Sequence, residues 1–186
     1  MRVFLLTSFP TLDFDSPAPL GFEEVFTRCA DHLSESDLQE LEEVCSRPPE
    51  GSSSFAHQWQ RVWETIQAKN KAERLAKIPS MAQEKEISPS HHPDSQLRSD
   101  LEVAWAETDP LKRETALLKS EWNWLESKRR LSPFSLDDLF GYALQLRLLE
   151  RKDSWEEAAG ETQFTTHVRS FIDPVLEDLA PQEAHA

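Results

Sequence analysis

Glycine is scarce in this sequence, and the motifs that depend on it are missing. The 186 residues include four glycines, and none of them stands before a Lys-Ser or Lys-Thr pair. A phosphate-binding loop needs such glycines because its backbone amides must approach the phosphates closely. The sequence also lacks a GxSxG turn, CxxC and HExxH motifs, and any His with a Glu three residues before it. We therefore expect a protein that is not an enzyme and that holds no metal or cofactor.

Cysteines and long apolar runs are also few. Two cysteines, Cys29 and Cys45, do not make a disulfide framework, and both fall at apolar positions of predicted helices. We expect them to be reduced thiols in the core. No segment approaches the roughly 18 apolar residues that span a bilayer. The start, MRVFLLTSF, lacks the length and cleavage site of a secretory signal, which predicts a cytoplasmic protein.

Basic residues are outnumbered. Lys and Arg total 20 against 34 Asp and Glu, a net charge of -14. Residues 1–54 hold three basic side chains against eleven acidic ones, whereas residues 100–152 hold nine against ten. This balance argues against a nucleic acid ligand and against direct docking to an anionic membrane, because both require a basic surface. A simpler interpretation is that the acidity keeps the protein in solution.

Residues Ser135 to Arg151 show the strongest helical pattern in the chain. Apolar side chains occur on nearly every side of this segment: Leu136, Leu139, Phe140, Tyr142, Ala143, Leu144, Leu146, Leu148 and Leu149. A helix that is apolar nearly all round is normally buried among neighbours. Ser135 followed by Asp138 is a capping box, which marks the start of the helix. We expect this segment to be the central helix of the fold.

Further apolar stripes at helical spacing begin near residues 20, 34, 55, 97, 110 and 164. Ser34 and the pair Asp109-Pro110 predict helix starts. The apolar run at residues 3–6 fits either a buried strand or the first turn of a helix. Together these patterns predict an all-α fold, a compact bundle of about six or seven helices with a flexible central linker.

The predicted boundaries follow the composition. Residues 1–78 form an N-terminal helical part, and residues 79–95 form a Pro- and Ser-rich flexible linker. Residues 96–180 form a C-terminal helical part that packs with the first as one unit, and residues 181–186 form a frayed tail. His91-His92 lies in the linker with no further ligand nearby in the sequence, so it does not indicate a metal site.

Three passages resemble a known family. They are VFLLTSFPTLDFDSPAPLGFEEVFTRCADHLSESDLQELE, DPLKRETALLKSEWNWLESK and FSLDDLFGYALQLRLLERKDSW. The residues that carry the resemblance are Phe9, Pro10, His32, Leu33, Ser34, Glu35, Asp37, Asp109, Pro110, Leu111, Glu114, Trp122, Leu125, Phe134, Tyr142, Ala143, Leu146 and Trp155. The family comprises short, uncharacterised bacterial proteins encoded among V-type ATPase subunit genes. The second and third passages also look distantly similar to a helical repeat of the C-type subunit of V/A-type ATPases, the counterpart of the d-type subunit of the eukaryotic enzyme.

The resemblance implies a non-catalytic accessory or coupling subunit of a bacterial V-type ATPase that supports ATP-linked ion transport. Its partners would be other ATPase subunits on the rotor-shaft or membrane-ring side, and it would be peripheral to the membrane through that complex. The C-type subunit is longer than this chain, which argues against a one-for-one replacement. A free-standing regulatory adaptor that binds a partner helix is the alternative.

The predicted helix from Pro110 to Arg130 carries a candidate partner surface. Leu117 and Trp124 lie about 100–140° from its main apolar stripe and form a second apolar strip, which fits either packing within this chain or an exposed face that docks a partner. Lys128, Arg129 and Arg130 stand at the same helix end, and Trp and Arg are enriched at binding hot spots. The alternative is that Leu117 and Trp124 pack on another helix of this chain, the one that holds Trp59 and Trp63.

Overall fold

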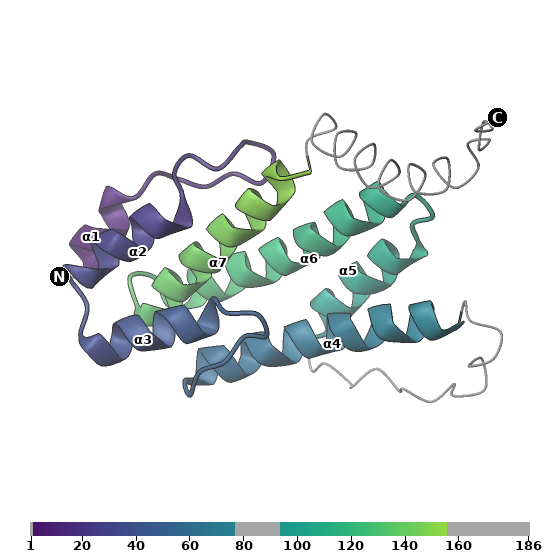
Figure 1. Cartoon of the computed structure of the whole chain (residues 1–186), viewed down its shortest axis with the longest axis horizontal. Helices are drawn as coiled ribbons and strands as arrows, with labels where there is room; N and C mark the ends of the chain where they lie inside the picture. The colour runs from purple at the N-terminus through teal and green to yellow at the C-terminus, as the bar shows by residue number, and fades with distance from the viewer. Residues whose placement is uncertain (1, 77–93, 156–186) are drawn as a thin grey trace, which may run out of the picture. The chain divides into compact units, whose positions relative to one another are not determined.

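Helices account for all the regular secondary structure that the computed structural model describes, in residues 2–76 and 94–155 (Figure 1). The elements are α1 (Arg2–Ser8), α2 (Phe22–Ala30), α3 (Glu35–Val44), α4 (Ser54–Ala76), α5 (Ser95–Ala106), α6 (Pro110–Leu131) and α7 (Leu136–Asp153). Seven helices with no strand in these residues confirm the predicted all-α class. Residues 3–6, which fitted either a strand or a helix in the sequence, belong to the helix α1.

The chain divides into two compact units, residues 1–150 and residues 151–186. This boundary falls inside residues 96–180, the C-terminal part that the sequence predicts to pack with residues 1–78 as one unit. Asp94 caps α5, which begins at Ser95, so the helix starts at the last residue of the predicted linker, one residue before the predicted C-terminal part. The rest of the linker, with His91-His92, lies outside the described residues, as do the helix predicted near residue 164 and the tail at 181–186.

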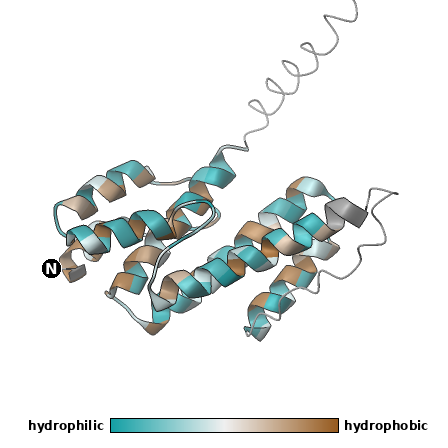
Figure 2. Cartoon of the chain, turned by 60° about the horizontal axis from the view of Figure 1, so that its bottom comes forward, coloured by the Kyte–Doolittle hydropathy of each residue, from teal (hydrophilic) through white to brown (hydrophobic). Residues whose placement is uncertain are grey.

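α7 is the central helix of the first unit, as predicted. Eleven of its residues are buried: Asp138, Leu139, Phe140, Gly141, Tyr142, Ala143, Leu144, Gln145, Leu146, Leu148 and Leu149. α6 runs beside it in Figure 1, and α4 passes along the same group of helices. The outer helices carry teal and brown residues on different sides in Figure 2, as expected for amphipathic helices around a buried one.

Several helices begin at the capping residues that the sequence predicts. The Ser34 side chain accepts a hydrogen bond from the Asp37 amide at the start of α3. Asp109 accepts from the amides of Leu111 and Lys112 at the start of α6. In each case a side-chain oxygen satisfies amides that have no partner within the helix.

Carboxylates from other helices bind amides at two further helix starts, and at α4 the Ser53 hydroxyl also accepts from the Ala56 amide at 3.0 Å. Gly21 offers no side chain at the start of α2, and Glu150 of α7 accepts from the Phe22 amide at 2.7 Å. Glu40 of α3 accepts from the Ser52 and Ser53 amides just before α4, at 3.0 and 2.8 Å to Oε1. These carboxylates therefore connect helices while they stabilise helix ends.

The N-terminal segment packs against α7 and α6. Phe9 stacks on Tyr142 with ring centroids 5.1 Å apart, and the Tyr142 hydroxyl donates to the Pro10 carbonyl at 3.0 Å. Farther along, Phe14 meets Trp122 of α6 edge-on at 5.6 Å. These contacts hold the loop between α1 and α2 on the central helices.

Candidate interaction surface

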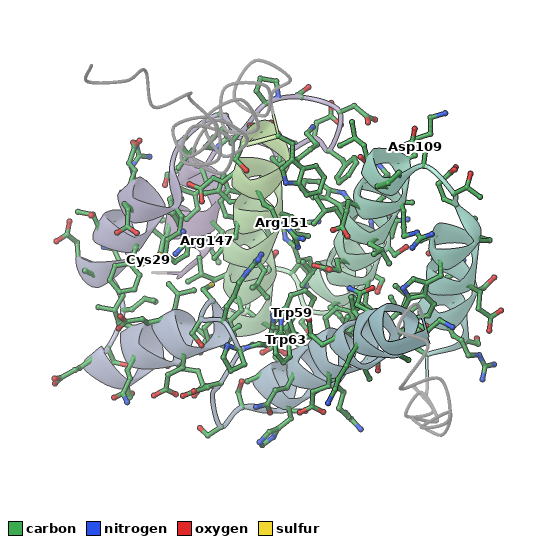
Figure 3. The ribbon with its side chains drawn as sticks, turned by 45° about the vertical axis from the view of Figure 1, so that its right-hand side comes forward. Cys29, Trp59, Trp63, Asp109, Arg147 and Arg151 are labelled. Atoms are coloured by element: carbon green, nitrogen blue, oxygen red, sulfur yellow. The ribbon has the colours of Figure 1, made fainter. Side chains whose placement is uncertain are left out.

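Leu117 and Trp124, the apolar part of the predicted partner surface, are buried in the protein. Trp124 is 4% exposed and its ring lies 5.8 Å from that of Trp59 and 6.1 Å from that of Phe55. In Figure 3, Trp59 lies on the side of α4 that faces α6 and α7. Of the two interpretations of this strip, packing within the chain is therefore confirmed, with Trp124 on the helix that holds Trp59, and the exposed face is wrong for these two residues. α6 is buried on two sides, toward α7 and toward α4, so its second apolar strip forms an internal contact.

The main apolar stripe of α6 is buried only in its later part. Leu118, Trp122 and Leu125 are buried, whereas Leu111 is exposed and Thr115 half-buried.

The Trp124 indole nitrogen is buried without a hydrogen-bond partner in the described residues. A buried donor without a hydrogen bond destabilises the folded state. The contacts of the Trp124 ring with its aromatic neighbours must therefore offset this loss of free energy.

The three basic residues at the end of α6 have different surroundings. Lys128 Nζ lies 5.1 Å from the centre of the Trp124 ring, a cation–π distance. Arg130 is exposed and pairs with Glu126 at 2.6 Å on the same helix. Arg129 turns inward and pairs with Asp138 of α7. Lys128 and Arg130 thus remain near the surface, whereas Arg129 is engaged within the protein.

Arg129 joins a buried polar network between α6 and α7. Its Nε donates to Asp138 Oδ1 at 2.7 Å, and its NH1 donates to Gln145 Oε1 at 2.6 Å. Gly141 makes room for the arginine stem, since a Cβ there would lie 2.5 Å from Arg129 Cγ. The guanidinium carbon also lies 5.2 Å from the centre of the Tyr142 ring. A network with matched donors and acceptors fixes the relative position of the two helices.

Residues 131–134, which we term the corner, connect α6 to α7 and present two large apolar side chains to solvent. Leu131 is 76% exposed and Phe134 is 46% exposed. The Ser135 hydroxyl donates to the Ser132 carbonyl at 2.6 Å, and the Phe134 amide donates to Asp138 Oδ2 at 2.9 Å. The corner is therefore bonded internally at both ends although its apolar side chains point outward.

Phe134 has a strained backbone. Its φ is 62°, in the left-handed region that a bulky non-glycine residue rarely adopts. Such a conformation costs on the order of 1–3 kcal/mol and persists only where the surroundings impose it. The sequence indicated only a short turn at residues 131–134. No periodic pattern predicts this conformation, which occurs together with the bond from the Phe134 amide to Asp138.

The other exposed large apolar side chains occur on helices. They are Val3 and Phe4 of α1, Val103 of α5 and Leu111 of α6. Val103 and Leu111 are single exposed apolar residues, which are common on protein surfaces, whereas Val3 and Phe4 are a second exposed pair. The corner, which starts at the last residue of α6, differs from that pair because Phe134 has a strained backbone conformation.

The thiols are packing groups. Burial raises the pKa of Cys29 to about 11 and that of Cys45 to about 12. A neutral solution therefore contains little thiolate at either position, and the thiolate is the reactive form. Both cysteines are free, as predicted, with Cys29 buried and Cys45 half-buried.

Arg147 lies on α7 across from α2, with its guanidinium carbon 3.9 Å from the centre of the Phe22 ring (Figure 3).

The described residues contain neither a candidate metal site nor a candidate membrane span. No group of three or more His, Cys, Asp or Glu side chains in residues 2–76 and 94–155 is arranged to hold a metal ion. No helix in the same ranges is both long enough and apolar enough to cross a membrane.

Comparison with known proteins yields one family match. A family model described as "Protein of unknown function (DUF2764)" matches residues 95–174, a segment that includes α5, α6, the corner and α7. No curated protein and no solved structure matches the chain. The matched segment thus contains the Arg129 network and the exposed apolar pair, but the family description names no activity.

Proposed function

We propose that the protein is a non-catalytic accessory or coupling subunit of a bacterial V-type ATPase, similar to the C-type subunit, and that it binds its neighbours in that complex through the corner. The observation that carries the binding role is the exposure of Leu131 and Phe134 on a turn held by internal hydrogen bonds. The assignment to the ATPase rests on the sequence resemblance, which includes Phe134 itself.

The geometry of the corner suits binding for an entropic reason. An interface gains most from side chains whose position is already fixed, because less freedom is lost on association. Aromatic side chains are also frequent among the residues that dominate binding energy. Phe134 combines both properties, since its backbone is fixed by the Asp138 bond while nearly half of its surface is exposed.

The charges beside the corner favour one kind of partner. Lys128 lies three positions before Leu131 and therefore on the same side of α6, and Arg130 immediately precedes Leu131. Lys128, Arg129 and Arg130 are consecutive at this helix end, where Arg129 is paired with Asp138 and Arg130 with Glu126. We infer a protein partner with an apolar groove for Leu131 and Phe134 and acidic residues along the groove edge that faces α6.

Co-purification tests this function directly. A tagged chain is produced in cells together with the subunits of a bacterial V-type ATPase, and the captured subunits are identified. The wild type is expected to retain rotor or head subunits. The double variant Leu131→Asp/Phe134→Asp is expected to retain about tenfold less, because carboxylates would be buried in the partner's apolar groove.

Val103→Asp is the matched control, because Val103 is 72% exposed on α5, outside the corner. It introduces the same chemical change and should leave capture unchanged. Equal loss in the control and the corner variant, with both proteins folded, would contradict the assignment of binding to the corner. Failure of the folded wild type to retain any ATPase subunit would contradict the ATPase assignment itself.

A further inference from the structure

The strained conformation of Phe134 depends on a carboxylate that serves two helices. Asp138 Oδ2 accepts the Phe134 amide at 2.9 Å, while Oδ1 accepts Arg129 Nε at 2.7 Å. The Asp138 amide in turn donates to Ser135 Oγ at 3.1 Å. The sequence predicts that Asp138 completes a capping box with Ser135. In the structure the carboxylate instead accepts a hydrogen bond from the amide of Phe134, the residue before Ser135.

This difference matters because Phe134 is the exposed aromatic of the corner. In a reciprocal capping box, the acid would bond to the amide of the capping residue and leave the preceding residue free. Here the acid accepts the amide of Phe134 itself, the residue whose φ lies in the left-handed region. Arg129 fixes the acid from the other side and is itself held by Gln145.

We propose that Asp138 is the positioning residue of the binding corner, with Arg129 as its support. The carboxylate holds Phe134 in its strained conformation before any partner arrives, so that the partner meets a preformed apolar surface. This inference deepens the proposed function and rests on it for the identity of the partner. The conformational part can be measured in the protein alone.

Amide hydrogen exchange of the full chain provides that measurement. In Asp138→Ala, the Phe134 amide loses its acceptor, and we expect its exchange to speed up about tenfold or more, because hydrogen bonds to charged groups are strong. Asp137→Ala is the control, since it removes the neighbouring carboxylate in the same first turn of α7. It should leave exchange at Phe134 nearly unchanged.

Arg129→Lys provides a milder test if Asp138→Ala does not fold. Lysine keeps the positive charge but cannot hold Asp138 and Gln145 with two separate nitrogens of a planar group. We expect faster exchange at Phe134, smaller in size than for Asp138→Ala. Unchanged exchange at Phe134 in a folded Asp138→Ala or Arg129→Lys protein would overturn the positioning role.

Binding to the purified V-type ATPase completes the test. We expect Asp138→Ala to weaken binding about tenfold relative to Asp137→Ala, although neither residue belongs to the exposed apolar pair. An acid that served only to cap α7 would change stability and leave the affinity of the folded fraction the same, and that result would overturn the proposal. A third outcome is faster exchange at Phe134 in Asp138→Ala together with no binding of the wild-type protein to the ATPase. That outcome would reject the ATPase as the partner but would still support the positioning of Phe134 by Asp138.

Discussion

Trp122 and Trp124 lie two positions apart on α6 and therefore point to different sides of the helix, yet both are buried. Trp122 meets Phe14 of the N-terminal segment, and Trp124 meets Trp59 and Phe55 of α4. A single amphipathic helix cannot bury both side chains against one neighbour. At the scale of residues, α6 is thus a core helix with two packed sides, and its aromatic residues join it to two different elements.

Trp124→Ala should strongly destabilise the isolated protein. The substitution leaves a cavity beside Trp59 and Phe55, and truncation of a buried aromatic typically costs about 3–5 kcal/mol. Urea denaturation measures this loss as a change in the free energy of unfolding. Val103→Ala, at an exposed position, should change the same quantity by about 0.5 kcal/mol or less. A similar small effect for Trp124→Ala would contradict the packing of α6 on α4.

Tyr142 is the only tyrosine of the sequence, so its ionisation can be followed without interference from another phenol. Burial raises its pKa to about 12, against an opposing effect of Arg129 and Arg28. The folded state binds the phenolic proton more tightly than the unfolded state does. The protonated Tyr142 hydroxyl therefore makes its full contribution to the free energy of unfolding below pH 10. This contribution is lost as the pH rises toward 12.

Ultraviolet absorbance of tyrosinate tests this prediction. The midpoint should lie near pH 12 in the folded protein and near pH 10 in urea. Circular dichroism at each pH establishes whether the helices persist during the titration. A midpoint near 10 with the helices intact would show that the Tyr142 hydroxyl is not buried against Pro10.

Capping shows which parts of the elements could be predicted from the sequence. Ser34 and Asp109 stand directly before the amides that they cap, so a local pattern predicts them correctly. Glu150 lies 128 positions from the amide of Phe22, and no local pattern predicts that contact. Local chemistry therefore predicts most helix starts, whereas contacts between helices depend on the tertiary fold.

The candidate site shows the same division. The helix ends that border the corner and the basic residues of α6 were predictable from spacing and the helix dipole. The burial of Leu117 and Trp124 was one of two interpretations open from the sequence, because a helical wheel reports that two faces are apolar but not whether a neighbour covers each. The left-handed conformation of Phe134 was not predictable, because neither its φ nor the sharing of Asp138 between Phe134 and Arg129 has a local sequence signal.

Glu40 provides a prediction at the scale of elements. Burial alone would raise its pKa, but hydrogen bonds from Ser53 and Ser52 outweigh that effect and lower it. Glu40→Ala removes the acceptor for the amides just before α4 and should cost about 1–2 kcal/mol at neutral pH. Glu42→Ala, an exposed acid on the same helix, is the control and should cost less than about 0.5 kcal/mol.

The pH dependence of this cost has a defined sign. A lowered pKa in the folded state means that the stabilisation by Glu40 is present above its ordinary value of 4.5 and is lost as the pH falls through the folded value. The stability difference between wild type and Glu40→Ala should therefore narrow in acid. Denaturation curves at several pH values measure it, and a constant difference would contradict the lowered pKa.

At the scale of the whole molecule, the first unit is closed by contacts between its beginning and its end. Phe9 and Pro10 bind Tyr142, and the start of α2 is capped by Glu150, the last residue of that unit. These contacts join the N-terminal segment to α7 without any residue after 150. The family match at 95–174 crosses the same boundary, so the matched segment extends beyond this closed unit.

A chain that ends after residue 155 should therefore fold on its own. It retains all of α7, which ends at Asp153, and every contact of the N-terminal segment described above. We expect one cooperative thermal transition with a melting temperature within about 4 °C of the full chain, roughly 1 kcal/mol for a domain of this size. A chain that ends at residue 134 lacks α7 and with it most of the central core, so it should show no cooperative transition. If the chain of 155 residues also lost its transition, residues 156–186 would be required for folding and the independence of the first unit would be disproved.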